Sequence, residues 1–383
     1  MSASPLRPRA LTGAAMLALA SPLARADYRL NFQDPVTPVA REIYDLHMLI
    51  LWICVAIGVV VFGVMIYSMV KHRKSRGAVP ASFHENTRLE VVWTIIPFVI
   101  LISMAIPATK ALLALEDTSD ADLTVRITGL QWKWKYEYDA DGTPVSYISS
   151  LKPEHLQARQ KGSGVDVREI DHYLLDVDNP LVLPVGKKVR FLVTSDDVIH
   201  SWWVPAFGTK KDAIPGFVNE AQTFIEKPGI YRGQCAELCG KDHAFMPIVV
   251  KAVPEAEYRT WLAQQKVAAQ AAAAEASAEK VWSEAELVAR GREIYTGKGG
   301  CFGCHGASGE GVATFPALAG SAVANGDAAK HLDTVIHGRP GTAMAAYGSQ
   351  LNDLELAAVI TYERRSWGNT GSVVQPADVK AAR

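Results

Sequence analysis

The segment CAELCGKDHAFM, from Cys235 to Met246, carries two thiols, an imidazole and a thioether in a short run. Its pattern is C-x3-C-x3-H-x2-M, with Cys239 and His243 as the inner members. Upstream, DDVIHSWWVP supplies His200 at the end of a predicted strand. Thiolate, imidazole and thioether donors form a soft ligand set that suits copper, and methionine is not a zinc ligand. The segment therefore predicts a copper site.

These donors can be arranged in several ways. The two cysteines form a disulfide in one, and a Cys2His2 zinc site with the histidines in another. A one-copper blue site uses two histidines, one cysteine and a weak axial methionine, which leaves one thiol unused. Two thiolates that bridge two copper ions use every donor, with the backbone carbonyl of Glu237 as a second weak ligand. We favour this arrangement because two metals that share one electron change their geometry little on oxidation and reduction. A small change in geometry favours fast electron transfer.

A second motif, CFGCH, spans Cys301 to His305. The spacing C-x-x-C-H is the attachment signature of c-type haem, in which Cys301 and Cys304 form thioether bonds and the adjacent histidine ligates iron. The same letters also occur by chance in thioredoxin-like and zinc proteins. Here the chain carries an export signal and a candidate second iron ligand, so we predict covalent haem.

That second ligand is Met344 in GRPGTAMAAYG, the only methionine after Met246. Its Gly-Pro loop can approach the iron without the constraint of a helix. His331 and His337 compete for the same position. Ligation by histidine and methionine raises the reduction potential and leaves no open site, which indicates electron transfer rather than gas chemistry.

Three apolar segments predict on which side of a membrane the parts of the chain lie. Residues 1–26 have the basic start, short apolar run and A-x-A site of a secretory signal peptide, and the run is too short for the alternative, an uncleaved anchor. Residues 46–70 and 91–109 are long and apolar enough to span a membrane, and buried helices of a soluble protein are the alternative. The basic loop KHRKSR between them is assigned to the cytoplasm, so both chain ends lie outside.

The rest of the sequence predicts further domains. A formal net charge of -1 argues against a nucleic-acid binder. Short β-branched and aromatic runs separated by turns predict a sandwich or Greek-key barrel, interrupted by a polar loop at Leu151–Asp166 to which we assign no function. Ser283 and Glu286 have the spacing of a capping box, so a helix begins there, and Asn352 is a candidate N-cap of another.

The predicted divisions are 27–115 for the N-terminal segment and hairpin, 116–255 for the β-domain, 256–282 for a semi-rigid, partly helical Ala-rich linker, 283–370 for an all-α domain and 371–383 for a disordered tail.

Two stretches, DDVIHSWWVPAFGTKKDAIPG and YRGQCAELCGKDHAFMPIVV, resemble the binuclear copper, or CuA, domain of subunit II of haem-copper cytochrome c oxidases. The likeness covers nearly all of residues 27–253. It implies an all-β cupredoxin-like Greek-key barrel behind a two-helix transmembrane hairpin. It also implies that the Glu237 side chain faces a magnesium ion at the boundary with subunit I, as suits a hard carboxylate ligand. The implied copper ligands are His200, Cys235, Glu237 through its carbonyl, Cys239, His243 and Met246.

The same resemblance gives roles to two other residues. Trp132, in GLQWKWKYEY, matches the tryptophan through which electrons enter the copper site. The alternative is an aromatic side chain that packs on a sheet. Glu90, in RLEVVWTIIP, matches a carboxylate near the mouth of a proton-uptake path in subunit I, and otherwise reads as a charge that caps a helix. The chain departs from the family at Leu130 and Lys133, where a histidine and an aromatic residue are frequent.

Residues 283–370 resemble a class I cytochrome c, and the fusion of this all-α domain to a copper-bearing subunit II resembles the caa3-type oxidases. The resemblance implies an electron-transfer subunit of a respiratory, proton-pumping oxidase, with no oxygen-reducing site of its own. Electrons would pass from the covalent haem through the copper pair to subunit I. The implied partners are oxidase subunits I and III, the membrane, and a soluble cytochrome c or another periplasmic donor. The implied location is the bacterial inner membrane, with the copper and haem domains on the periplasmic side.

Three other classes of protein fit less well. A quinol-oxidase-like subunit II that only scaffolds its complex would lack the cysteine and histidine ligands. A nitrous-oxide-reducing enzyme would need a further His-rich catalytic domain, which ten scattered histidines do not supply. An exported copper store would need labile ligands open to solvent.

Overall fold

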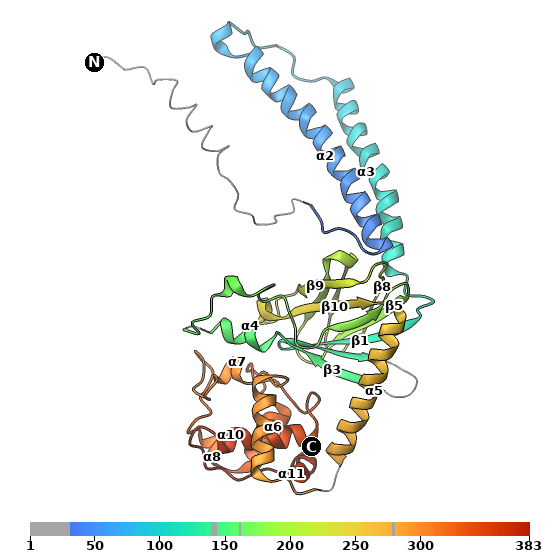
Figure 1. The fold of residues 1–383 in the computed structure, drawn as a ribbon. Helices are drawn as coiled ribbons and strands as arrows, with labels where there is room; N and C mark the ends of the chain where they lie inside the picture. The colour runs from blue at the N-terminus through green and yellow to red at the C-terminus, as the bar shows by residue number, and fades with distance from the viewer. Residues whose placement is uncertain (1–30, 139–143, 161, 278–279) are drawn as a thin grey trace, which may run out of the picture. The chain divides into compact units, whose positions relative to one another are not determined.

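The computed structural model describes residues 31–138, 144–160, 162–277 and 280–383. The predicted signal peptide, residues 1–26, lies outside the described residues. From Pro35 onward the chain forms, in order, a helical hairpin, a β-domain of two sheets, a long helix and an all-α domain (Figure 1).

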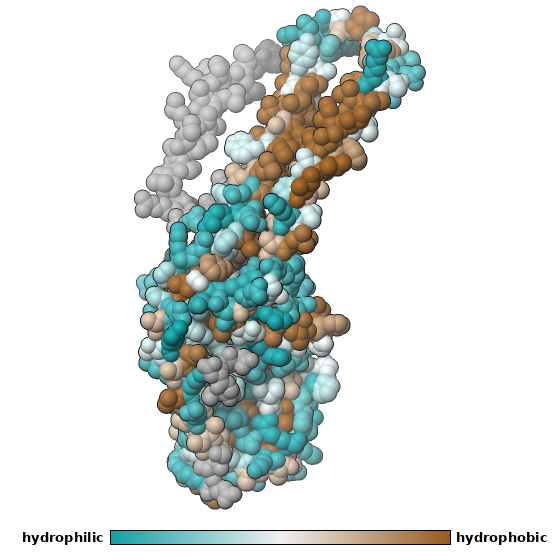
Figure 2. All heavy atoms as spheres, turned by 90° about the vertical axis from the view of Figure 1, so that its right-hand side faces the viewer, coloured by the Kyte–Doolittle hydropathy of each residue, from teal (hydrophilic) through white to brown (hydrophobic). Residues whose placement is uncertain are grey.

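Two apolar helices form the hairpin, α2 (Pro38–Lys71) and α3 (Thr87–Glu116). Both are long and apolar enough to cross a bilayer, which confirms the predicted transmembrane helices. Figure 2 shows apolar side chains covering both. A short 3-10 helix, η1 (Lys74–Arg76), lies in the basic loop between them.

Both helices extend past the predicted spans toward the β-domain. α2 begins eight residues before residue 46, because the Thr37 side chain accepts a hydrogen bond from Ala40 N and Pro38 occupies the first turn. Thr37 Oγ1 also donates to Phe207 O at 2.9 Å. Near the end of α3, Ala114 O accepts a hydrogen bond from Gln222 Nε2 at 3.1 Å. The hairpin is therefore joined to the β-domain by hydrogen bonds at both of its outer ends.

The β-domain consists of two five-stranded sheets, which confirms the predicted cupredoxin-like class. The first sheet has the order β3-β2-β1-β5-β8, in which only β1 and β5 pair in parallel. Its strands are β1 (Leu123–Leu130), β2 (Lys133–Tyr138), β3 (Val145–Ser149), β5 (Lys188–Ser195) and β8 (Asn219–Phe224). The second sheet has the order β4-β10-β9-β6-β7, with strands β4 (Leu181–Pro184), β10 (Pro247–Val253), β9 (Gly229–Cys235), β6 (His200–Val204) and β7 (Thr209–Ala213).

The core of the β-domain lies between the sheets and is rich in aromatic side chains. In β5 every second residue is buried, as expected for a strand with one face in the core. Phe191 of this strand packs against Trp202 of β6, with ring centroids 4.9 Å apart. Trp134 and Tyr136 of β2 are fully buried in the same cluster. These rings fix the ends of β2 and β6, from which the functional side chains project.

Two segments outside the sheets are more ordered than the sequence suggested. The stretch predicted as a polar loop contains the helix α4 (Pro153–Ala158). The predicted linker contains the helix α5 (Glu255–Ser277), and its Trp261 ring lies 5.3 Å from that of Tyr138. The start of the linker is therefore packed on the β-domain.

The C-terminal domain is all α and confirms the predicted class. Both predicted caps form: Ser283 with Glu286 opens α6, and Asn352 with Glu355 opens α10. α6 and α10 cross at Gly291, where a Cβ would lie 2.1 Å from Ala358 O. The helices are α6 (Glu284–Thr296), α7 (Phe302–His305), α8 (Ala322–Asn325), α9 (Ala328–His337), α10 (Asp353–Arg365) and α11 (Pro376–Ala382).

The prediction of a disordered tail at 371–383 is wrong. The tail forms α11, which has a capping box between Gln375 and Asp378. Val379 is fully buried, and the Arg383 guanidinium donates to Asp353 Oδ1 at 2.5 Å and to Leu351 O at 2.8 Å. Two buried valines, Val374 and Val379, and the terminal Arg383 order the segment, and so few positions give no periodicity from which a helix could be predicted.

The crossing of α6 and α10 predicts a strong effect of Gly291→Ala. The added methyl group would meet Ala358 O and the Tyr362 side chain, so the helices must separate, at a cost of about 1–3 kcal/mol in the free energy of unfolding. Thermal unfolding of the haem-loaded domain measures this. Arg292→Ala, one position along on the exposed face, is the control, and an equal effect of both variants would contradict the packing argument.

Candidate copper centre and haem site

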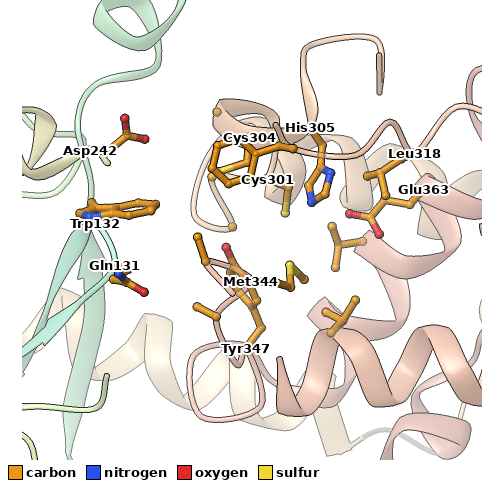
Figure 3. Close-up of a pocket in the computed structure, with 18 of the residues that line it drawn as sticks. Gln131, Trp132, Asp242, Cys301, Cys304, His305, Leu318, Met344, Tyr347 and Glu363 are labelled. Carbon is orange, nitrogen blue, oxygen red and sulfur yellow. The ribbon is translucent and has the colours of Figure 1, made fainter. Parts of the chain in front are cut away.

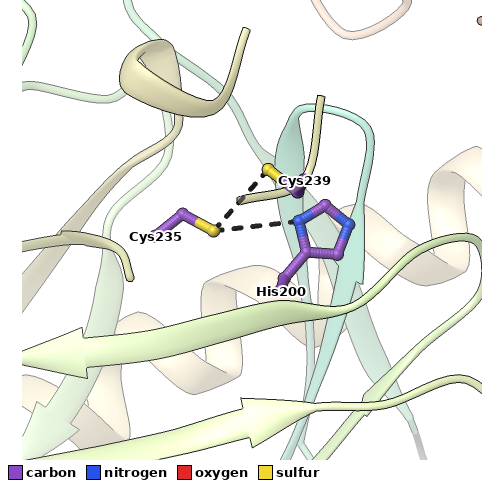
Figure 4. Close-up of side chains that lie close together, drawn as sticks. All are labelled: His200, Cys235 and Cys239. Carbon is purple, nitrogen blue, oxygen red and sulfur yellow. Dashed lines mark hydrogen bonds between the residues drawn. The ribbon is translucent and has the colours of Figure 1, made fainter. Parts of the chain in front are cut away.

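The four thiol and imidazole candidates meet at one end of the second sheet. β6 begins at His200 and β9 ends at Cys235, and the following loop carries Cys239 and His243. The two Sγ atoms lie 3.8 Å apart, and Cys235 Sγ lies 3.9 Å from His200 Nδ1 (Figure 4). Cys239 Sγ lies 3.5 Å from His243 Nδ1. Each thiol thus has an imidazole nitrogen beside it, with its partner thiol on the other side.

The two weak donors lie on the same loop. The backbone oxygen of Glu237 is 3.4 Å from Cys235 Sγ. Met246 is buried, and its backbone oxygen accepts a hydrogen bond from Cys235 N at 3.1 Å. The side chain of Glu237 is exposed, and the neighbouring Leu238 is 84% exposed.

This donor set fits copper held between two thiolates. A disulfide requires a sulfur separation of about 2.05 Å, whereas these sulfurs are 3.8 Å apart and both cysteines are free. Cys235 and Cys239 are 5% and 3% exposed, so the sulfurs lie in an apolar, water-poor environment. A set of two thiols, two imidazoles and a thioether, all buried except the partly exposed His243, matches the preferences of copper rather than those of zinc.

The two thiols shift each other's pKa in opposite directions. The Cys239 thiol donates to Cys235 Sγ, which holds the pKa of Cys235 well below its usual range. The same hydrogen bond, with burial, raises the pKa of Cys239 well above its usual range. Because metal ligands must be thiolates, metal binding at this pair releases protons.

Asp197 and Gly129 fix the orientation of the His200 ring. His200 Nε2 lies 2.8 Å from Asp197 Oδ1, which leaves Nδ1 directed at the sulfurs, as is usual for a metal-binding histidine. Asp197 Oδ2 also accepts a hydrogen bond from Gln131 N at 2.6 Å. At Gly129 of β1, a Cβ would lie 2.7 Å from the His200 ring, so only glycine leaves room for it.

A cavity of about 590 Å³ lies beside the CFGCH motif, lined by residues of the C-terminal domain and of the β-domain. Cys301, Cys304, His305 and Met344 all line it, and Figure 3 shows His305, from the end of α7, and Met344, from a loop, directed into it. His305 Nδ1 lies 2.8 Å from Pro316 O, which leaves Nε2 free for iron. A large cavity with two adjacent thiols and an oriented imidazole fits a covalently attached haem.

The competing iron ligands are placed less favourably than Met344. His331 lines the cavity, but its Nε2 lies 2.9 Å from the buried Glu363 Oε2. His337 is exposed at the end of α9. The loop that carries Met344 turns at Gly338, where the φ angle is +70° and a Cβ would lie 2.6 Å from Met344 O. Of the three candidates, Met344 is therefore the one that a tight turn holds beside the cavity.

One wall of the haem cavity belongs to the β-domain. Trp132, at the turn between β1 and β2, lines the cavity and faces it in Figure 3. Its indole Nε1 donates to Cys239 O at 3.1 Å, and Gln131 Nε2 donates to the same oxygen at 3.1 Å. A single tryptophan therefore contacts both the copper loop and the haem cavity.

The structure does not bring Glu90 into this site. It lies in the first turn of α3, where its Oε1 is 3.4 Å from Asn86 N. Asn86 Oδ1 in turn accepts from Leu89 N at 3.2 Å. Glu90 thus contributes to the start of a transmembrane helix.

Sequence reasoning missed several residues of the site. Asp197 was quoted only as part of DDVIH, although an acid close before a metal-binding histidine is a signal for an orienting carboxylate. Lys241 stands inside the copper loop, and its Nζ lies 3.4 Å from Gly303 O. Arg159, from the stretch thought to have no function, lines the haem cavity and pairs with Asp242 at 2.6 Å.

Comparison with known families agrees with this architecture. Residues 25–111 match the transmembrane domain of cytochrome c oxidase subunit II, and residues 123–253 match its periplasmic domain. Residues 286–362 match the family described as cytochrome c oxidase, cbb3-type, subunit III. The copper domain implies a CuA site and the cytochrome domain implies haem c.

Individual relatives show the same family. A probable cytochrome c oxidase subunit 2 of Rickettsia bellii is 39% identical over 244 residues, which cover 63% of this chain and 86% of the relative. The mitochondrial subunit 2 of Glycine max is 38% identical over 247 residues, covering 63% of this chain and 60% of the relative. The periplasmic domain of subunit II from Bradyrhizobium japonicum is 42% identical, with a TM-score of 0.34, and covers 39% of this chain and 96% of that one.

The chain belongs to the cytochrome c oxidase subunit 2 family. It is therefore part of an oxidoreductase complex that contains other oxidase subunits. Its two membrane helices and its periplasmic-domain match place it in the inner membrane with periplasmic domains.

The contact between Gly129 and His200 predicts that Gly129→Ala damages the copper site. The methyl group would displace the imidazole that Asp197 orients, and disturbing such an outer contact costs about 10–100-fold in metal affinity. Copper titration of the periplasmic part measures this, with circular dichroism to show that the fold is kept. Thr128→Ala, on the same strand, is the control. Unchanged copper affinity of a folded Gly129→Ala variant would contradict the prediction.

Proposed function

We propose that this chain is subunit II of a caa3-type cytochrome c oxidase. It passes electrons from a covalently bound haem c through the CuA site to subunit I, where oxygen is reduced and protons are pumped. The observation that carries the proposal is Trp132, which hydrogen-bonds the backbone of the copper loop and forms part of the haem cavity.

The geometry of the two sites supports the proposed ligands. Cys301 and Cys304 attach the haem, and His305 and Met344 ligate its iron. Histidine and methionine together leave no position open, so the haem supplies electron transfer alone. The chain's own contribution is to hold the imidazoles, exclude water from the thiols and set the Trp132 ring between the two sites. The proposed copper ligands are His200, Cys235, Glu237 through its carbonyl, Cys239, His243 and Met246.

Two further assignments rest on exposed groups. Glu237 projects from the copper loop beside the exposed Leu238, as suits a residue at a subunit boundary, and we assign its carboxylate to magnesium at the interface with subunit I. Glu90 is exposed at the start of α3, next to the basic loop, and we assign it to the entrance of a proton path in subunit I. Subunit III and a soluble cytochrome c or another periplasmic donor complete the proposed partners.

A copper store is the alternative that the burial of the ligands disfavours. A store must release its metal, which requires ligands open to solvent. His200, Cys235, Cys239 and Met246 are each at most 5% exposed. Copper held in this cage would leave slowly even in the presence of a chelator.

The covalent linkage predicts that haem-to-copper transfer does not depend on concentration. A tether replaces bimolecular docking by an effective concentration of about millimolar order. In a soluble fragment from Glu116 to Arg383, flash reduction of the haem should be followed by copper reduction at a rate unchanged on tenfold dilution. Two coppers and one haem per chain, with an electron paramagnetic resonance pattern from one electron shared by two copper nuclei, are the accompanying expectation. A rate that falls in proportion to dilution, or a single-copper pattern, would overturn the proposal.

Lys133 predicts how haem-to-copper transfer depends on pH. Burial lowers the pKa of Lys133 to about 8, an effect that the Lys298 ammonium reinforces and the carboxylates of Asp197 and Asp178 oppose. When the domains separate, the ammonium returns to water and to its ordinary pKa of about 10.4. Between these two pH values the docked lysine is neutral and the separated lysine is charged, so association releases a proton. Below about pH 8 the lysine is charged in both states, and docking carries the full cost of desolvating the ammonium. This cost falls as the pH rises.

The docked fraction should therefore increase between about pH 8 and pH 10. The amplitude of fast haem-to-copper transfer measures it in the same fragment. Lys133→Met, which has no proton to lose, should remove the dependence. An amplitude that falls with pH in the parent, or rises equally in the variant, would contradict the assignment.

A further inference from the structure

Lys133 contacts two backbone oxygens and an aromatic ring of the haem domain. It follows Trp132 directly and is 5% exposed. Its Nζ lies 3.3 Å from Lys298 O and 3.4 Å from Gly299 O, just before the CFGCH motif. The ammonium also lies 4.7 Å from the centroid of the Tyr347 ring. Backbone oxygens and a ring face stabilise a cation that has left water.

Lys241 makes the same kind of contact on the other side of Trp132. Its Nζ lies 3.4 Å from Gly303 O and 4.6 Å from the centroid of the Phe315 ring. The Trp132 ring centroid is 5.9 Å from the same ammonium. Asp242 Oδ2 lies 3.3 Å from it, and Asp242 is also paired with Arg159. Two ammonium groups thus flank the proposed entry point for electrons.

We propose that Lys133 and Lys241 reserve Trp132 for the chain's own haem domain and exclude free cytochromes whose haem edge is ringed by lysines. The proposal rests on the function proposed above. The attached domain places backbone oxygens and aromatic rings against both ammonium groups. A lysine-ringed cytochrome would place cations there, and would leave the buried Lys133 ammonium without the backbone oxygens that the attached domain supplies.

The exclusion has two physical components. Like charges brought together at an interface cost several kcal/mol and slow the encounter of the two proteins. A buried ammonium without acceptors carries a desolvation cost that nothing offsets. Specificity of this kind is achieved by a penalty on the wrong partner rather than by stronger binding of the right one.

The test reverses the two charges in the complete oxidase complex. In Lys133→Glu/Lys241→Glu, carboxylates face the carbonyls of the attached domain, which offer them no donor, but can pair with lysines of a free cytochrome. We mix each complex with reduced soluble cytochrome c that has a lysine-ringed haem edge, and follow the attached haem and the copper pair by separate absorbance bands. One electron leaves the ferrous haem of the free protein, which becomes ferric, and reduces either the attached haem or the copper pair.

In the parent complex we expect no direct reduction of copper by the free cytochrome. In the reversed variant we expect direct copper reduction to rise by about tenfold or more at low ionic strength and to fall with added salt. Transfer from the attached haem to copper should slow in the same variant. Lys187→Glu/Lys251→Glu makes the same change in charge at partly exposed or exposed positions that do not line the cavity, and should leave both rates unchanged.

The outcomes separate this inference from the proposed function. If the attached haem of the parent complex never reduces copper, the proposed function fails. If it does, and the free cytochrome still does not reduce copper directly in the reversed variant, the inference is wrong. An equal gain in the control variant would also overturn it, because general charge rather than the two lysines would then control access. Copper and haem content, measured for each variant, shows that both sites are intact.

Discussion

The backbone oxygen of Cys239 accepts hydrogen bonds from Trp132 Nε1 and Gln131 Nε2, and this shared acceptor joins the copper loop to the turn between β1 and β2. A carbonyl has two lone pairs, so both donors are satisfied at once. The same turn is held from the other side, because Gln131 N donates to Asp197, which also orients His200. The position of the tryptophan therefore depends on the same groups that position the metal ligands. A change in either would move both.

The membrane hairpin and the copper domain form a continuous hydrogen-bonded unit. Arg41 of α2 pairs with Glu226, and Lys211 of β7 pairs with Glu116 at the end of α3. These ion pairs are partly exposed and each contributes little, but Thr37 and Gln222 add hydrogen bonds to backbone oxygens. A copper site that must deliver electrons to a membrane-bound partner requires a fixed height above the membrane. Helices that run past the apolar span into the β-domain meet this requirement.

The sequence predicted the local ligand motifs of this protein better than the contacts between residues that lie far apart in the chain. The ligand motifs are local, since C-x3-C-x3-H-x2-M and C-x-x-C-H each fall within one short loop, and the apolar spans and capping boxes are also read within a few turns. Asp197, Lys133 and Lys241 act through space, and no local pattern distinguishes them from ordinary surface charges. The order of α11 was missed for a related reason, because it depends on Val379 and Arg383 meeting partners on other elements. Resemblance supplied what local patterns could not, including the proposed role of Trp132.

The linker limits the positions that the haem domain can take. α5 has 23 residues and so is about 34 Å long. Its first turns pack on the β-domain through Tyr258 and Trp261, and near its other end Glu275 pairs with Arg290 of α6 at 2.6 Å. A helix held at both ends samples far fewer positions than a flexible chain of the same length, which raises the effective concentration of the haem domain at Trp132. The contact itself can then be weak. The buried Lys133 and the exposed Lys241, both placed against backbone oxygens, suit such a contact, because the tether supplies proximity and the lysines supply selectivity.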